Sequence, residues 1–259
     1  MFTNNPFAAL SDALPASVMQ IYVVLMVLAV LGGTLFDIVH KGSARYFFEN
    51  WRRSRHKAPQ AVRGGEMVSL AVKTGLVDVL ASGEFCNARR RIAHLLTMYG
   101  FVIYVATTAC MVFATPATPA PPYVPLLWWI GGSMVCVGGY WFWFFIRVDV
   151  TAEGNSPLRI VRADLFVLSL LSSVTLGLLW AWLQARASGV AHLFFGLYII
   201  ATTVLFGSIP WSKFAHMFFK PAAAFGKRVS YANGSRSNLP SPSDKPEQFG
   251  SAREQPRHY

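Results

Sequence analysis

The sequence predicts an all-α integral membrane bundle of five transmembrane helices, with the N-terminus outside and the C-terminus in the cytoplasm (N-out/C-in). Three observations lead to this prediction: an apolar composition, five long apolar runs, and basic residues that gather in alternate loops. Of the 259 residues, 54% are hydrophobic and only 14% are charged, and the mean hydropathy is +0.40. Soluble domains carry roughly 25% charged residues, so lipid is the expected solvent.

Each of the five apolar runs is long enough to cross a bilayer, whose hydrocarbon core of ~30 Å needs about 20 helical residues. Backbone polar groups in lipid must be satisfied within their own segment, which makes a helix the expected structure of every run. The predicted spans are residues 16–39, 93–114, 123–146, 163–185 and 191–216.

These spans divide the chain into two parts. Residues 1–220 form the predicted five-helix membrane domain, which includes a long cytoplasmic loop at 40–91 between the first and second helices. Residues 221–259 are rich in Ser, Pro and charge, and we predict a disordered cytoplasmic tail there.

The orientation follows from the basic residues, because cytoplasmic loops carry an excess of Lys and Arg. In the five-span plan, all of the 23 Lys and Arg except Arg186 lie on the side of the loop 40–91. The sequence therefore predicts a multi-pass protein of the bacterial inner (cytoplasmic) membrane. The net charge of +11 is divided among loops between apolar runs, and this distribution excludes a nucleic-acid partner.

The loop 40–91 is more than a connector. Its segment GGEMVSLAVKTGLVDVLAS spaces apolar residues three and four apart, which predicts a short amphipathic helix at the membrane interface. Before it, the run RYFFENWRRSRHK interleaves aromatic residues with arginines. This run is explained equally well by an anchor on lipid headgroups and by a docking surface for a cytoplasmic partner.

Two histidines at one depth are the candidate metal ligands. Ionisable groups in membrane helices are costly and mark functional sites. His94 lies about one turn inside the cytoplasmic end of the predicted second helix, and His216 lies at a similar depth at the end of the fifth. Imidazoles from two antiparallel helices at one level are the arrangement that a bis-histidine haem b requires. Two interfacial histidines without a metal remain the alternative.

Charged residues near this pair are candidates for contacts with the haem propionates: Arg90, Arg91 and Lys213. A third histidine, His192, begins the fifth helix at the outer end, where no second histidine is available as a partner. A quinone contact is therefore its functional interpretation, with Tyr198 as a second candidate contact. An interfacial structural histidine is the other interpretation.

The segments VDVLASGEFCNARRRIAHLLTMYGFVIYVATT (77–108) and FGSIPWSKFAHMFFKP (206–221) resemble the membrane cytochrome b family of the nitrate reductase gamma subunit. The resemblance is closest to the membrane anchor of adenylylsulfate reductase and to the membrane subunit of the quinone-interacting membrane-bound oxidoreductase. In the nitrate reductase family, each of two haems is held by one histidine from the second helix and one from the fifth. By motif, His94 and His216 resemble the pair on the cytoplasmic side, whereas the outer positions here are Tyr104 and Tyr198.

The resemblance implies one haem b and an electron-transfer role. The chain would be a membrane anchor that links a cytoplasmic sulfur-metabolism oxidoreductase, adenylylsulfate reductase, to the quinone pool. No flavin or nucleotide fingerprint occurs in the sequence, so the chain would be a non-catalytic or quinone-reactive subunit. A haem-free anchor and a two-haem cytochrome b of another respiratory reductase are the alternatives. A transporter is disfavoured, because the spans lack a mid-depth carboxylate and an inverted repeat.

Overall fold

A computed structural model describes residues 2–10, 13–40, 42, 45, 47–49, 51–52, 58–83, 85, 87–115, 117–147, 160, 164–211 and 216–235. For residues 211 and 216–219 it describes the backbone alone. Throughout this part of the chain the structure is helical and contains no strand.

Four helices are long and apolar enough to cross a membrane, so the chain is a multi-pass membrane protein. They are α1 (Ala16–His40), α4 (Ala88–Phe113), α5 (Tyr123–Trp141) with its π-helical extension η3 (Phe142–Ile146), and α7 (Leu165–Ala185). These bounds agree with the first four predicted spans to within five residues at either end.

The predicted fifth span is shorter than expected. The apolar helix α8 covers Ala191–Gly207 and is followed by the 3₁₀ turn η5 (Ile209–Trp211). Pro210 explains the break, because proline has no N–H to donate and its ring clashes with the carbonyl four residues earlier. Residues 212–215 lie outside the described residues.

A further helix, α9 (His216–Ala232), follows the break. It includes the first part of the segment 221–259, for which the sequence predicted disorder. The run HMFFKPAAAFGKRVSYA mixes apolar and basic residues, and its apolar residues pack against the loop 40–91: Phe225 stacks on Trp51 with 5.5 Å between ring centroids. The tertiary contact, which composition alone does not reveal, stabilises this helix.

The segment before α1 closes one end of the bundle. The Asn5 side chain donates a hydrogen bond to the carbonyl of Met111 near the end of α4 (2.9 Å), and Gln184 near the end of α7 donates to the carbonyl of Pro6 (3.0 Å). The Phe7 ring lies 5.0 Å from that of Trp180. The N-terminus and the loops that follow α4 and α7 therefore share one end of the bundle.

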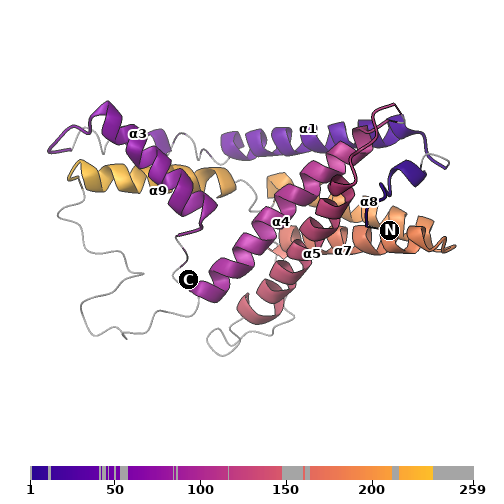
Figure 1. Ribbon diagram of the computed structural model, residues 1–259. Coiled ribbons are helices and arrows are strands. Elements are labelled where there is room, and N and C mark those ends of the chain that lie inside the picture. Colours follow the sequence, from indigo (N-terminus) through magenta and orange to yellow (C-terminus); the bar gives the residue numbers. More distant parts are fainter. Residues whose placement is uncertain are drawn as a thin grey trace.

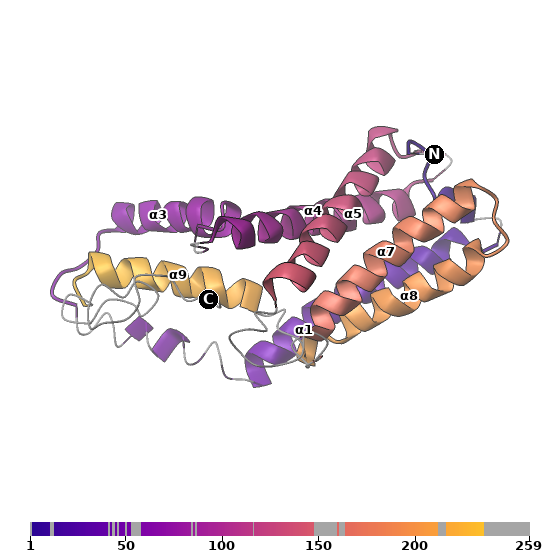
Figure 2. The ribbon, with the colours of Figure 1, turned by 90° about the horizontal axis from the view of Figure 1, so that it is seen from below.

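Glycines let α4 and α5 pack at very short range, as small residues do in membrane helix pairs. A Cβ on Gly100 would lie 2.7 Å from the carbonyl oxygen of Gly131, and a Cβ on Gly131 would lie 2.9 Å from the backbone nitrogen of Tyr104. Figures 1 and 2 show these two helices crossing side by side, next to the layer formed by α1, α7 and α8.

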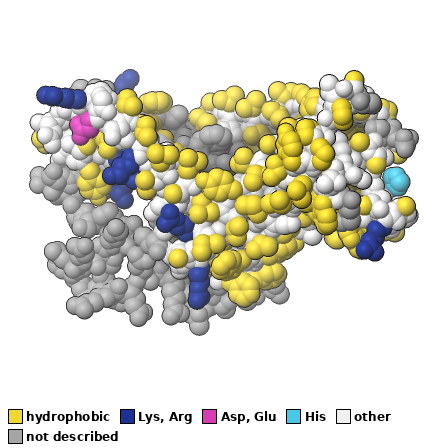
Figure 3. Space-filling view, viewed as in Figure 1, with side chains coloured by type: hydrophobic (Ala, Val, Ile, Leu, Met, Phe, Trp, Pro, Cys, Tyr) yellow, Lys and Arg dark blue, Asp and Glu magenta, His cyan; other side chains and the backbone are white. Residues whose placement is uncertain are grey.

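At the opposite end, three helical segments extend past α1, α7 and α8 (Figures 1 and 2). They are α3 (Gly64–Lys73), the π-helical segment η2 (Thr74–Leu80) that continues it, and α9. We call these three segments the arm. The helix that the sequence predicts in the loop 40–91 is confirmed as α3, whereas its predicted position at the membrane interface stays a prediction. In Figure 3, hydrophobic side chains cover the bundle, whereas most Lys and Arg side chains on this face lie toward the arm.

Candidate functional site

His94 lies on the first turns of α4, at the end of the bundle that carries the arm. Asn87 caps this helix by accepting hydrogen bonds from the backbone N–H groups of Arg89 and Arg90. The His94 imidazole is exposed, and its Nδ1 lies 3.1 Å from the hydroxyl of Ser82. When Nδ1–H donates to this hydroxyl, the lone pair of the neutral ring is on Nε2, the tautomer that suits a metal ligand.

Ser82 is held in a strained conformation. Its φ is +48°, in the left-handed region, and it is almost completely buried at 2% exposure. A non-glycine residue in this region costs of order 1 kcal/mol and persists only where its surroundings impose it. Here a backbone hydrogen bond from Gly83 to the carbonyl of Val77 (2.7 Å) closes the turn that directs the hydroxyl to His94.

Phe85 connects His94 with α9. Its ring lies 4.8 Å from the imidazole of His94, and the Nζ of Lys220 lies 5.6 Å from the centre of the same ring. His216 is the first residue of α9, one turn before Lys220 on the same side of the helix. The backbone of His216 is therefore one turn of α9 before the lysine whose side chain approaches Phe85, and the side chain of His216 is outside the described residues.

The predicted propionate contacts surround His94 in part. Arg90 and Arg91 precede it by four and three residues, so both are its neighbours on the helix surface. The Arg91 Nε donates a hydrogen bond to the carbonyl of Ala81 (2.7 Å), which fixes the turn beside α4. Lys213 lies outside the described residues.

These residues fit one haem b on the side of His94. The donor is an imidazole whose second nitrogen is held by a hydroxyl, and such an outer hydrogen bond is typical of metal-ligating histidines. The side chain of His216, the second predicted ligand, is outside the described residues, so the fit is tested at His94 alone.

The two tyrosines at the outer position do not fit a second haem. Tyr104 stacks on Trp128 with 5.0 Å between ring centroids, and Tyr198 stacks on Trp180 at 5.9 Å. Both tyrosines are buried and pack against Gly177 of α7, so their rings occupy the space between the helices. The described residues at this level therefore provide neither an imidazole ligand nor the room for a macrocycle.

Beside these tyrosines lies an apolar cavity of about 130 Å³ between α1, α4, α7 and α8. A cavity of this size holds a benzene-sized ring. Tyr104 and Tyr198 line it, and so do Val27 of α1 and Val105 of α4, whose side chains are exposed on the outer surface of the bundle. The cavity is thus bounded by residues that face lipid as well as by residues of the core.

The structure does not bring His192 to this cavity. His192 is exposed on the first turn of α8, whereas Tyr198 is buried and lies almost two turns further along. Of the two predicted quinone contacts, His192 and Tyr198, Tyr198 alone lines the cavity. The two predicted quinone contacts therefore do not form one site, and only Tyr198 remains a candidate for contact with a molecule in the cavity.

Sequence reasoning missed Ser82 and Phe85. Both belong to the turn between η2 and α4, and this turn folds back against α4. A hydrogen bond from the Tyr99 hydroxyl of α4 to the carbonyl of Leu80 (2.7 Å) holds it there. The Ser82-Gly83 dipeptide signals a turn, but only the folded chain shows that this turn lies beside His94.

Neither protein-family models nor curated proteins nor solved structures give a match to this chain.

Proposed function

We propose that this chain is a five-span membrane anchor that carries electrons between a cytoplasmic oxidoreductase and membrane quinone through one haem b. The fifth span is α8 with η5, residues 191–211, and the end of the bundle with the arm faces the cytoplasm. The soluble partner is an adenylylsulfate reductase, in keeping with the sequence resemblance, and the membrane is the bacterial inner membrane.

One observation supports this proposal most directly: the imidazole of His94 contacts Ser82 and Phe85, and the Phe85 ring is also approached by the Nζ of Lys220 in α9. A buried serine in a left-handed conformation is not needed to cap α4, because Asn87 already does so. Its role is explained if the orientation of His94 matters, as it does for an axial ligand.

In this proposal, histidines bind the haem iron and arginines balance the charge of its propionates. His94 and His216 would hold the iron from α4 and α9, and the Ser82 hydroxyl would keep Nδ1 of His94 protonated. Arg90 and Arg91 would balance the propionates at the headgroup level. Haem b would supply one-electron transfer between the soluble enzyme and quinone.

The cavity lined by Tyr104 and Tyr198 is the proposed quinone contact. Its volume of about 130 Å³ matches a single ring, and its walls are almost wholly apolar. Val27 and Val105, which face lipid, mark the side from which a membrane-soluble molecule would enter.

The break between α8 and α9 favours a second candidate, a haem-free anchor. Because α8 ends at Gly207, His216 is not on the apolar helix that the sequence predicted for it. In this alternative the chain tethers the soluble enzyme at the membrane, and another protein reacts with quinone.

Reconstitution separates the two candidates. The purified chain would be placed in liposomes with a reduced quinone, and the adenylylsulfate reductase of the same organism would be added outside together with its oxidised substrate, adenylylsulfate, as the electron acceptor. Quinol-dependent electron transfer that requires both the chain and His94 supports the conduit. Binding of the enzyme without electron transfer in either direction would leave only the anchor.

A further inference from the structure

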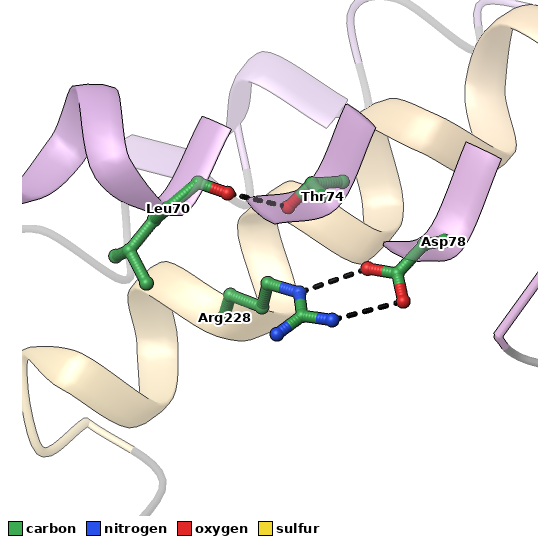
Figure 4. Close-up of polar contacts among 4 residues, drawn as sticks. All are labelled: Leu70, Thr74, Asp78 and Arg228. Carbon is green, nitrogen blue, oxygen red and sulfur yellow. Dashed lines mark hydrogen bonds and ion pairs between the residues drawn. The ribbon is translucent and has the colours of Figure 1, made fainter. Parts of the chain in front are cut away.

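The arm is held together by one apolar face of α3 and by an ion pair. Leu70 is half-buried and Thr74 is buried on the side that meets α9, and the Thr74 hydroxyl donates to the carbonyl of Leu70 (2.8 Å). One turn further, Arg228 of α9 donates two hydrogen bonds to Asp78 of η2, at 2.8 and 2.9 Å (Figure 4). These contacts give the arm a defined structure.

A second apolar face of the arm has no cover in the described part of the chain. Val68, Val72 and Leu76 follow one another at intervals of four residues, which places them on one side of the helix. They are 64%, 54% and 55% exposed, respectively. We call these three residues the arm stripe. A contiguous apolar stripe on a helix outside the membrane is typical of an interaction site.

The bilayer is not the expected cover. In both ribbon views α3 extends away from the ends of α1, α7 and α8 and does not lie across them (Figures 1 and 2). Because η2 and a short turn separate α3 from α4, the N-terminal end of the stripe is the part most distant from the spans along the chain. This direction argues against the interfacial position that the sequence predicts for this helix, because lipid at the ends of the spans would reach only part of the stripe.

A second copy of the chain is also disfavoured, because the charges around the stripe are mostly of one sign. Arg63, Lys73 and Lys227 are exposed on the arm, and Glu66 is the exposed acidic residue on α3. Two such surfaces would repel each other, whereas a partner with acidic residues around an apolar centre would be attracted.

We infer that the arm stripe is a docking surface for a soluble protein that presents an apolar patch with an acidic rim. This inference rests on the proposed function, whose soluble oxidoreductase is the partner, and it locates the contact on α3. Apolar side chains at the centre of an interface contribute most of the affinity, and the surrounding charges chiefly steer association.

Binding of purified adenylylsulfate reductase to the full chain in nanodiscs tests the inference. The double variant Val68→Ser/Val72→Ser should weaken binding about tenfold or more. Its matched control is Val18→Ser/Val24→Ser, which changes two exposed valines of α1 in the same way and should leave binding unchanged. Serine and valine have similar helix propensities, so α3 itself should persist.

A nitroxide label on Val72→Cys distinguishes burial of the arm stripe by the soluble enzyme from burial by lipid or by residues 236–259. The label should be accessible to a water-soluble relaxing agent, and it should become protected when the enzyme is added. Protection by the nanodisc lipid, or protection that disappears when residues 236–259 are removed, would overturn the inference. Unchanged binding by the stripe variant would overturn it and leave the proposed function standing. If the enzyme binds no form of the chain at low salt, both the partner and the docking surface are wrong.

Discussion

Arg228 of α9 and Asp78 of η2 form a two-point ion pair between residues 150 positions apart in the sequence. Their side chains are only 25% and 12% exposed, respectively, so loss of one partner leaves a mostly buried charge. We expect Arg228→Ala to make local opening of α9 easier by about 1–3 kcal/mol. Faster hydrogen exchange of the α9 amides would show this. The double variant Arg228→Ala/Asp78→Ala should lose less stability than the sum of the losses measured for the two single variants.

The same pair should give no pH dependence from Arg228 near neutrality. The hydrogen bond to Asp78 raises the pKa of Arg228 above its usual value. A raised pKa adds stability that is fully present below the pKa of the unfolded chain and is lost only as the pH rises through the higher folded value. Because arginine titrates far above neutral pH, α9 exchange protection, corrected for intrinsic exchange rates, should show no Arg228-linked change from about pH 6 to 9. A loss within that range that disappears in Arg228→Ala would contradict this assignment.

The contact between α4 and α5 should tolerate no added methyl group. A Cβ on Gly131 would lie 2.9 Å from the backbone nitrogen of Tyr104 and 3.0 Å from the carbonyl oxygen of Gly100. We expect Gly131→Ala to destabilise the bundle by roughly 1–3 kcal/mol, because backbone atoms cannot move aside as a side chain can. Thermal unfolding in detergent measures this. Gly196→Ala is the matched control, since a Cβ there has nothing within 4 Å, and its Tm should be equal or higher.

The first four spans could be predicted because lipid leaves a simple signal: about twenty apolar residues bounded by polar ones. The end of α8 could not be predicted with equal certainty. Pro210 is evident in the sequence, but a proline can either kink a helix or end it, so the residue alone does not say which occurs. The helix α9 depends on contacts such as Phe225 with Trp51, which local composition does not record.

For the candidate site, the sequence predicted only which residue types lie at a given depth in the membrane, and not which side chains contact one another. His94 stands out because imidazoles are rare in apolar helices. Ser82 has no such signal, because its proximity to His94 comes from a turn that folds back on α4. The distance between His192 and the cavity likewise depends on which face of α8 is buried, and α8 is apolar all round.

The five-span plan predicts that the two ends of the chain lie on opposite sides of the membrane. A reporter fused after Thr118, in the loop between α4 and α5, should be periplasmic, and one fused after Lys220 should be cytoplasmic. The reason is the concentration of Lys and Arg on the side of the arm. Both reporters on one side would show that α8 does not cross the membrane.

The cavity assignment predicts that Tyr198 acts in quinone binding. Tyr198→Phe should raise the apparent KM for quinol severalfold, because it removes a hydrogen-bond donor next to the cavity while keeping the ring packing. The absorption spectrum should not change. His192→Ala serves as the control, since that residue is exposed and outside the cavity. A loss of quinol activity in His192→Ala alone would move the site to the start of α8.

Ser82→Ala should weaken haem retention by about 10- to 100-fold, the range found for hydrogen-bond partners of metal-ligating histidines. It should also shift the midpoint potential of the haem, because the Nδ1 hydrogen bond raises the basicity of the ligand. Haem titration of the purified protein and a redox titration measure the two effects. Ser69→Ala, an exposed serine on α3, is the control. Equal retention and an unchanged potential in both variants would show that Ser82 serves only the turn.

The optical spectrum of the purified chain, produced with ample haem and reduced with dithionite, tests the proposed haem site most directly. We expect the sharp bands of a low-spin, bis-histidine haem b in the wild type, and their loss in both His94→Ala and His216→Ala while each variant still inserts into the membrane. A wild-type protein without these bands, or a variant of either histidine that keeps them, would contradict the assignment of the haem to His94 and His216.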